Sequence, residues 1–110
     1  MDPADLAREY YRAIDEGDYD ALAAVLAPGF VHDRPDRVLD GRAAFVRFMR
    51  EERPDPDTTH DIDALLVSED GAGVVCEGRL RRADGEVWFR FADVFAVEDG
   101  ALSHLRTYTH

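Results

Sequence analysis

The sequence has no lysine, a single cysteine and no long apolar run, and each absence narrows what the chain can be. One cysteine, Cys76, cannot form an internal disulfide and offers no Cys-x-x-Cys spacing for a metal ion. No stretch approaches the ~20 apolar residues that a membrane-spanning helix needs. The N-terminus, from Met1 to Asp5, is acidic and polar, so no signal peptide is visible and a cytoplasmic location is expected.

Basic residues are also scarce, because 24 acidic residues stand against 13 basic ones, all of them arginine, for a net charge of −11. A GC-rich genome that favours Arg and Asp codons would produce this composition. Adaptation to a salt-rich cytoplasm would also produce it, because ions screen the self-repulsion of an acidic chain. This second interpretation predicts a halophilic protein. Nucleic acid and anionic membranes are not expected as partners, because binding to either needs positive charge.

The 110 residues suffice for one domain with a modest core and are too few for two. Helical spacing and capping residues predict three helices, and apolar runs between turn residues predict strands. The helices are expected to follow the caps Asp2, Asp18 and Asp40 and to end at Gly17, Ala27 and Arg53. The expected strands are Phe30–Arg34, Ile62–Ser68, Gly73–Arg82, Glu86–Val97 and Ala101–Thr109, with a polar loop over Pro35–Leu39. This pattern predicts a single α+β domain over residues 1–110, with helices packed on one face of a sheet.

Asp93 is the only polar residue on the apolar face of its predicted strand. Strand alternation places it between Phe89, Phe91 and Phe95 on that face. Burial among aromatic rings penalises an ionised carboxylate, so its pKa should be raised, and the neutral form can donate a hydrogen bond. Two other outcomes remain open at this stage. The carboxyl group is paired with Arg106 or with a buried tyrosine, or the sheet curls and opens it to water.

The dipeptide Asp84–Gly85 predicts a two-residue hairpin turn between the two strands on either side of it. With that turn, the core-facing side of both strands stays apolar, whereas a three-residue loop would set Arg79 and Glu77 on the inner face. The predicted cross-strand pairs are Leu80 with Phe89, Gly78 with Phe91 and Cys76 with Asp93.

The last strand has two possible registers, which give Asp93 different neighbours. A two-residue turn at Asp99–Gly100 would bring Arg106 to Asp93 and hold the carboxylate ionised. A bulged loop that includes Glu98 would instead turn Leu105 and Thr107 toward the core. Both registers remain open.

Two further polar residues are candidates for the same site. Tyr10 lies on the buried stripe of the first helix, where its hydroxyl group needs a ligand or a backbone carbonyl as partner. Asp33 lies near the end of the first predicted strand, where it is either a site residue or a surface loop residue. None of the four histidines, at positions 32, 60, 104 and 110, has the spacing of a metal site. No cofactor fingerprint is present, so neither a metal nor a cofactor is expected.

Three segments, Tyr10–Asp20, Val25–Phe45 and Phe91–Arg106, resemble the nuclear transport factor 2-like superfamily, most closely its SnoaL-like and ketosteroid-isomerase-like branches. The resemblance implies a cone-shaped fold, with three N-terminal helices packed on a strongly bent, mixed or antiparallel sheet. It also implies a pocket between the layers and a homodimer through the outer sheet face. The pocket is expected to be lined by Phe30, Phe45, Phe89, Phe91, Phe95 and Leu105.

The resemblance also implies roles for three residues. Matched by motif, the general base of the ketosteroid-isomerase branch falls on Asp33, its oxyanion-binding tyrosine on Tyr10 and its oxyanion-binding acid on Asp93. The expected activity is proton transfer alpha to a carbonyl on a small hydrophobic ligand. An intramolecular aldol cyclisation, as in SnoaL-like cyclases, remains open. So do a non-catalytic module that binds a hydrophobic ligand or a protein, and a dimer subunit with a filled core.

Overall fold

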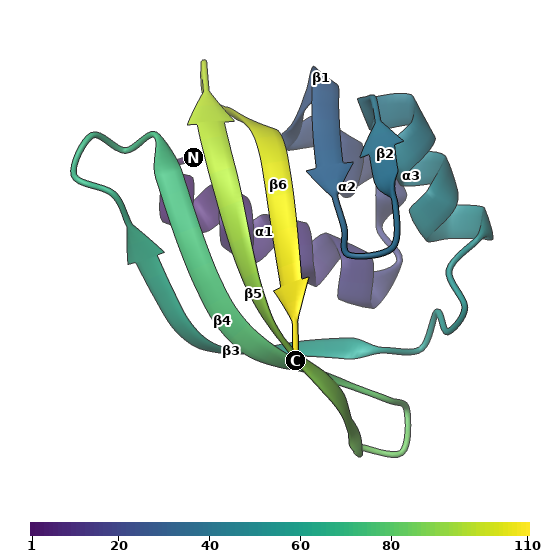
Figure 1. The fold of residues 1–110 in the computed structure, drawn as a ribbon. Helices are drawn as coiled ribbons and strands as arrows, with labels where there is room; N and C mark the ends of the chain where they lie inside the picture. Colours follow the sequence, from purple (N-terminus) through teal and green to yellow (C-terminus); the bar gives the residue numbers. More distant parts are fainter.

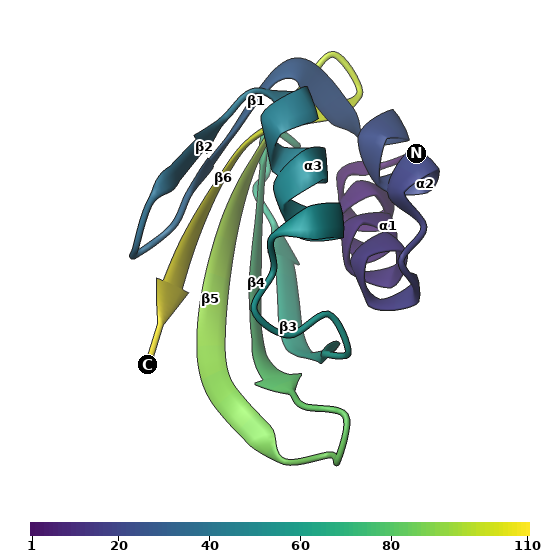
Figure 2. The ribbon, with the colours of Figure 1, turned by 90° about the vertical axis from the view of Figure 1, so that its right-hand side faces the viewer.

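One curved six-stranded sheet with three helices on a single side makes up the domain. The computed structural model describes all residues from Met1 to His110. The strand order is β2-β1-β6-β5-β4-β3, and every neighbouring pair is antiparallel except β1 and β6, which run parallel. The helices are α1 (Pro3–Glu16), α2 (Tyr19–Ala24) and α3 (Arg42–Glu51), and the strands are β1 (Leu26–Asp33), β2 (Val38–Asp40), β3 (Thr59–Val67), β4 (Gly73–Arg81), β5 (Val87–Glu98) and β6 (Ala101–Thr109) (Figures 1 and 2).

This arrangement confirms the α+β class and the mixed sheet, and it corrects the order of the elements. The helix α3 follows β1 and β2, so the three helices do not form one N-terminal block. None of them is long and apolar enough to cross a membrane.

Capping residues set two of the three helix starts as predicted. The Asp2 side chain accepts a hydrogen bond from the Asp5 backbone N–H at 2.8 Å, and Asp18 accepts one from Ala21 at 3.2 Å. Gly17 ends α1 in the left-handed region, with a φ of 67°. The predicted cap Asp40 is wrong, because Gly41 is the N-cap of α3 and makes no side-chain cap bond.

The segment after α2 differs most from the sequence-based expectation. The helix ends at Ala24 instead of Ala27, and β1 begins at Leu26. The backbone N–H of Leu102 donates to the Val25 carbonyl at 2.9 Å, so sheet pairing competes successfully with helix extension here. Pro28, which has no N–H, lies in the interruption of the β1–β6 ladder between Leu26 and Val31, where no ladder bond is lost.

The segment predicted as the loop Pro35–Leu39 contains part of a strand. The short strand β2 pairs antiparallel with β1 at the edge of the sheet. Three residues carry too little alternation to be recognised as a strand beside the charged turn that precedes them.

The β4–β5 register matches the prediction, although the turn that produces it does not. The loop is one residue longer than predicted, because the Arg82 N–H donates to the Glu86 carbonyl across Ala83–Gly85. Trp88 is then an extra residue in β5, and this β-bulge restores the predicted register. Trp88 lies at the edge of a cavity. The pairs are Leu80 with Phe89, Gly78 with Phe91 and Cys76 with Asp93.

The β5–β6 hairpin combines features of both expected alternatives. Asp99 and Gly100 have φ values of 51° and 76°, which fit a two-residue turn. Ser103 is then an extra residue in β6, so Asp93 lies opposite Thr107 instead of Arg106. Leu105 and Thr107 therefore face inward, and Arg106 lies opposite Val94 on the outer face.

The core lies between the helices and the concave face of the sheet. It contains 19 buried hydrophobic residues, most of them on α1, β1, α3, β5 and β6. Aromatic rings make up its centre, where the Tyr10 ring packs edge-on against Phe95 at 5.2 Å and Phe30 packs edge-on against Phe45 at 5.0 Å. One end of this core is open, and the cavity described below begins there.

Candidate functional site

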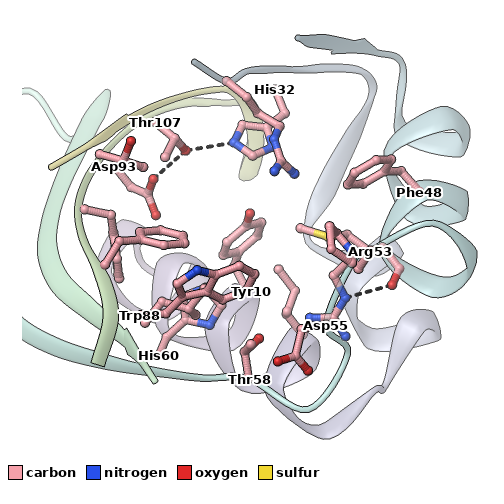
Figure 3. A pocket seen from close by; sticks show the side chains of 18 residues that line it. Tyr10, His32, Phe48, Arg53, Asp55, Thr58, His60, Trp88, Asp93 and Thr107 are labelled. Carbon is pink, nitrogen blue, oxygen red and sulfur yellow. Dashed lines mark hydrogen bonds between the residues drawn. The ribbon is translucent and has the colours of Figure 1, made fainter. Parts of the chain in front are cut away.

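A cavity of about 260 Å³ lies between the helical layer and the sheet (Figure 3). Side chains from α1, β1, α3, the loop after α3 and four strands form its wall. Exposed Pro54 and Trp88 stand at its rim, and Asp93 is buried at its inner end. The lining residues are Tyr10, Ile14, His32, Arg34, Phe48, Met49, Arg53, Pro54, Asp55, Thr58, His60, Leu80, Trp88, Phe89, Phe91, Asp93, Thr107 and Thr109.

Asp93 is 4% exposed and is held by two hydroxyl groups. Tyr11 donates to its Oδ2 at 2.7 Å, and Thr107 donates to its Oδ1 at 2.6 Å. Burial raises the pKa of Asp93, and the hydrogen bonds from Thr107 and Tyr11 offset part of that rise. The structure thus gives Asp93 a buried tyrosine as partner, and that partner is Tyr11 instead of Tyr10 or Arg106.

A third residue extends this hydrogen-bonded chain. The Nε2 atom of His32 lies 2.8 Å from Thr107 Oγ1. Because Thr107 has one hydroxyl proton, its bond to an ionised Asp93 requires His32 to donate from Nε2. The other ring nitrogen, Nδ1, is buried without a partner. Burial lowers the pKa of His32 to about 3, so the ring is neutral.

Tyr10 presents its hydroxyl group to the cavity, as Figure 3 shows. The residue is only 3% exposed, and no protein group bonds its hydroxyl. The Tyr10 oxygen is nevertheless not fully buried. His32 Nδ1 is the only fully buried side-chain polar atom that lacks a partner, so the unbonded Tyr10 oxygen must be accessible from the cavity. Burial raises the pKa of Tyr10 well above its usual range, so the hydroxyl remains a donor. Tyr10 and Asp93 therefore line one cavity without bonding each other.

Asp33 does not share that cavity. Its side chain is 42% exposed and forms an ion pair with Arg106 at 3.6 Å. Both residues line a separate hollow of about 330 Å³ beside the C-terminal end of β6, where most of the lining residues are polar. Strand alternation explains the placement, because His32 is the neighbour on β1 that points inward. The structure brings together two of the three expected catalytic residues and separates the third.

Only part of the expected pocket lining faces the cavity. Phe89 and Phe91 do so. The other four, Phe30, Phe45, Phe95 and Leu105, are at most 1% exposed and form the packed core behind it.

Sequence reasoning missed Tyr11 and the inward-facing position of His32. The Tyr-Tyr pair on α1 was the available signal for Tyr11, since both rings are buried on the same side of the helix. For His32 the signal was its alternation with Phe30 on the predicted strand, which places both side chains on one face.

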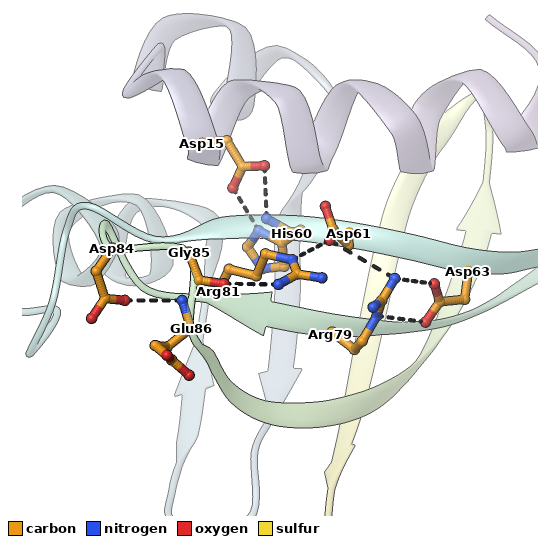
Figure 4. Close-up of polar contacts among 9 residues, drawn as sticks. All are labelled: Asp15, His60, Asp61, Asp63, Arg79, Arg81, Asp84, Gly85 and Glu86. Atoms are coloured by element: carbon orange, nitrogen blue, oxygen red, sulfur yellow. Dashed lines mark hydrogen bonds and ion pairs between the residues drawn. The ribbon is translucent and has the colours of Figure 1, made fainter.

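His60 and Asp15 form a second polar pair at the cavity wall (Figure 4). His60 Nδ1 lies 2.6 Å from Asp15 Oδ1, and the His60 backbone N–H donates to Asp15 Oδ2 at 3.0 Å. The two side chains are 15% and 18% exposed. The His60 ring packs against the rings of Tyr11 at 5.0 Å and Phe91 at 5.6 Å. No group of three or more His, Cys, Asp and Glu side chains is placed to hold a metal ion.

Two arginines give the cavity wall positive charge. Arg34 lies over the Phe48 ring at 5.0 Å and pairs with Asp36 at 3.2 Å. Arg53 donates to the backbone carbonyl of Met49 at 2.9 Å, which fixes the loop after α3. Both guanidinium groups oppose the burial-driven rise in the pKa of Tyr10. Burial and the neighbouring Asp93 outweigh the two arginines, so the pKa of Tyr10 remains raised.

Comparisons with known proteins agree on the family and the fold. The model of the SnoaL-like domain matches residues 7–105. An NTF2-like protein of unknown function from Cytophaga hutchinsonii superposes with a TM-score of 0.85 at 14% identity, covering 100% of this chain and 91% of that one. A protein from Kribbella flavida named "putative ketosteroid isomerase" gives 0.85 at 24% identity, with 98% and 77% covered. A "putative polyketide cyclase" from Pseudomonas putida gives 0.79 at 20% identity, with 98% and 91% covered. The search of curated proteins gives no match.

Proposed function

Because the chain belongs to the SnoaL-like domain family, we propose that it is a small enzyme of the isomerase or cyclase kind, acting on a hydrophobic carbonyl compound. Its reaction is proton transfer alpha to the carbonyl, with stabilisation of the oxyanion that forms. One observation carries this proposal. A buried carboxyl group with a raised pKa and an unpartnered tyrosine hydroxyl line the same largely apolar cavity.

In this proposal Tyr10 and neutral Asp93 bind the carbonyl oxygen of the ligand. Tyr11 donates to Oδ2 of the carboxyl group, so the acid proton of neutral Asp93 lies on Oδ1 and is donated to the ligand, while Oδ1 still accepts from Thr107. Such bonds strengthen as charge moves onto the oxygen, because the donors are buried and already oriented. Phe89 and Phe91 supply the apolar wall that selects a hydrophobic ligand.

The similar structures are consistent with this class of reaction without deciding between its members. One is named as an isomerase and one as a cyclase. Both reactions pass through an enol or enolate, so the same oxygen-binding pair serves either one.

A series of substituted phenols tests the proposal, because phenolates imitate the charged oxygen of an enolate. Affinity for the wild type should rise as the phenol becomes more acidic. Tyr10→Phe should weaken binding of the most acidic phenol by about 10- to 100-fold, the range for a hydrogen bond to a charged group. Tyr108→Phe is the matched control, since Tyr108 lies outside the cavity and is 52% exposed. Equal affinities for wild type and Tyr10→Phe would refute the proposed role of Tyr10.

A non-catalytic binding module is the second candidate function, and the position of Asp33 favours it. The residue expected to be the base lies outside the cavity, paired with Arg106. A protein that only binds would hold a β,γ-unsaturated ketone without moving its double bond. An isomerase assay with that ketone separates the two functions, since binding without turnover supports the module.

A further inference from the structure

We propose that His60, oriented by Asp15, is the general base of the cavity. The proposal rests on the function proposed above and supplies the group that it lacks. With Asp33 outside the cavity, none of the residues expected from the sequence can remove a proton from a ligand held by Tyr10 and Asp93. His60 is the residue of the wall whose position suits this step.

Asp15 fixes which nitrogen of His60 is free. Its carboxylate accepts from Nδ1 at 2.6 Å and, with its second oxygen, from the His60 backbone N–H at 3.0 Å. The backbone bond anchors the start of β3 to α1, so the ring has a defined position (Figure 4). In the neutral ring the Nδ1 proton faces Asp15, and the lone pair is on Nε2.

The Nε2 atom of His60 is available to a ligand. No protein group bonds Nε2. It is also not fully buried, because the only fully buried side-chain polar atom without a partner is His32 Nδ1. The ring lines the cavity, and its other edge is occupied by Asp15. Because Asp15 occupies the Nδ1 side, Nε2 is the ring nitrogen that remains free for a ligand in the cavity.

His60 and Asp93 line the same cavity and contact the same buried side chain. Tyr11 bonds the carboxyl group of Asp93 through its hydroxyl at 2.7 Å, and its ring packs against the His60 ring at 5.0 Å. The proposal therefore places the carbonyl oxygen of the ligand at Asp93 and its α-carbon at His60.

The proton transfer balances without any other reactant. His60 Nε2 takes the proton from the α-carbon, the C–H bond electrons form the C=C bond of the enolate, and the carbonyl π electrons move to oxygen. Tyr10 and Asp93 bind that oxygen. Return of the proton from Nε2–H to the γ-carbon completes an isomerisation. In a cyclisation the enolate carbon instead forms a C–C bond to a second carbonyl of the same ligand, and the alkoxide that results takes the proton from Nε2–H. Asp15 stabilises the imidazolium that exists between the two steps.

Exchange of the α-hydrogen with solvent deuterium measures this step directly. With a β,γ-unsaturated ketone, the wild type should exchange the α-hydrogen, and His60→Gln should slow the exchange by about 100-fold or more. Glutamine keeps the backbone bond to Asp15, so the fold should be retained, which thermal unfolding checks. His104→Gln is the matched control, because His104 lies outside the cavity. An unchanged exchange rate in a folded His60→Gln protein would overturn the proposal.

Phenol binding distinguishes this inference from the function beneath it. His60→Gln should bind acidic phenols within about threefold of the wild type, because it does not contact the oxygen. If the protein binds phenols but the exchange rate does not depend on His60, the role of His60 as general base is refuted and the proposed oxyanion site is retained. A wild type that neither binds phenols nor exchanges the ketone would refute both.

Asp15 is a positioning residue, and its test must report more than stability. Nitrogen NMR of the wild type should show His60 with the proton on Nδ1. In Asp15→Asn the amide can present its NH₂ to the ring, so the proton should move partly to Nε2 and the exchange rate should fall with it. Nitrogen shifts that are the same in both proteins would overturn the role of Asp15.

Discussion

The Thr107 hydroxyl group connects two buried titratable side chains, Asp93 and His32. The carboxyl group has a raised pKa and the imidazole a lowered one, and burial is the largest cause for both. Both shifts favour the neutral form. The site therefore concentrates hydrogen-bonding groups in an apolar cavity with little fixed charge at its inner end.

The free energy of unfolding should depend on His32 at acid pH. In the folded protein its pKa is about 3, whereas in the unfolded chain it is about 6.5. The unfolded chain therefore binds the extra proton between those values, and the free energy of unfolding falls as the pH is lowered, by about 1.4 kcal/mol per pH unit from this group alone. Chemical denaturation at several pH values should show a shallower acid limb for His32→Gln. Parallel profiles for the two proteins would contradict this prediction.

Tyr11 should control how readily Asp93 ionises. Tyr11→Phe removes the donor to Oδ2, so the pKa of Asp93 should rise further, and carbon NMR of the carboxyl group can follow its titration. The free energy of unfolding should also fall, by about 1–3 kcal/mol at neutral pH, because a buried carboxyl oxygen loses its partner. Tyr108→Phe is the control, and the same Asp93 titration in all three proteins would show that Tyr11 has no such role.

Single extra residues recur along the strands that surround the cavity. Asp63 in β3, Trp88 in β5 and Ser103 in β6 each interrupt a regular ladder by one position. A β-bulge bends its strand and increases the local twist. The curvature of β4 and β5 around the helices in Figure 2 is consistent with this effect.

Gly78 on β4 should be the least replaceable residue of the sheet. A Cβ atom at this position would overlap the carbonyl oxygen of Asp61 and stand 2.8 Å from the ring of Phe91. The backbone oxygen cannot move aside without breaking the β3–β4 ladder, so Gly78→Ala should lower the free energy of unfolding by about 1–3 kcal/mol. Gly29→Ala on β1 is the control, because no atom lies within 4 Å of its added Cβ. Equal urea midpoints for the two variants would contradict this reasoning.

The contrast between two hairpins shows how far the sequence predicts this fold. The β4–β5 register was predictable because only one alignment keeps both core-facing rows apolar, whatever the turn does. On β6 the rows with Leu105 and with Arg106 each mix apolar and polar residues. The bulge at Ser103 then decides between them, and bulges leave no clear pattern in a sequence.

The candidate site was predictable to a similar degree. Asp93 could be found because a lone carboxyl on an apolar strand face is conspicuous, and Tyr10 because it lies on a helical stripe. Asp33 was misplaced because the resemblance to the ketosteroid-isomerase motif assigned it, although strand alternation with Phe30 turns His32 inward instead. The pairing of His60 with Asp15 joins residues that are 45 positions apart, which no local pattern predicts.

At the scale of the whole molecule, a net charge of −11 should make stability depend on salt. Raising NaCl from 0.1 M to 1 M shortens the screening length from about 10 Å to about 3 Å, which weakens the repulsion between surface carboxylates. The melting temperature should therefore rise. A variant with Glu69, Glu86 and Glu98 changed to Gln carries −8, that is −11 with three negative charges removed, and should depend less on salt. A melting temperature that falls with salt would contradict the prediction.

The outer face of the sheet should mediate a homodimer. Leu66, Val75 and Val94 are cross-strand neighbours on β3, β4 and β5, and they are 68%, 37% and 38% exposed. Such an apolar stripe on a monomer is typical of an interface, and an antiparallel sheet face suits a two-fold axis. Analytical ultracentrifugation should show a dimer for the wild type and a monomer for Val94→Glu. Val38→Glu, at an exposed position on β2, should remain dimeric. A monomeric wild type at high concentration would refute the interface.

The extra residue at Ser103 has a consequence for how such a site can diversify. A regular ladder continued from the Asp99–Gly100 turn would pair Asp93 with Arg106, whereas the bulge pairs it with Thr107. The same amino acids in the same strand order thus encode either a neutral acid or a permanently charged carboxylate. The position of the β-bulge along β6 decides whether Asp93 is a neutral acid or a charged carboxylate. Insertions and deletions near a hairpin, more than substitutions in the cavity, are therefore the variation through which this scaffold would exchange one chemistry for another.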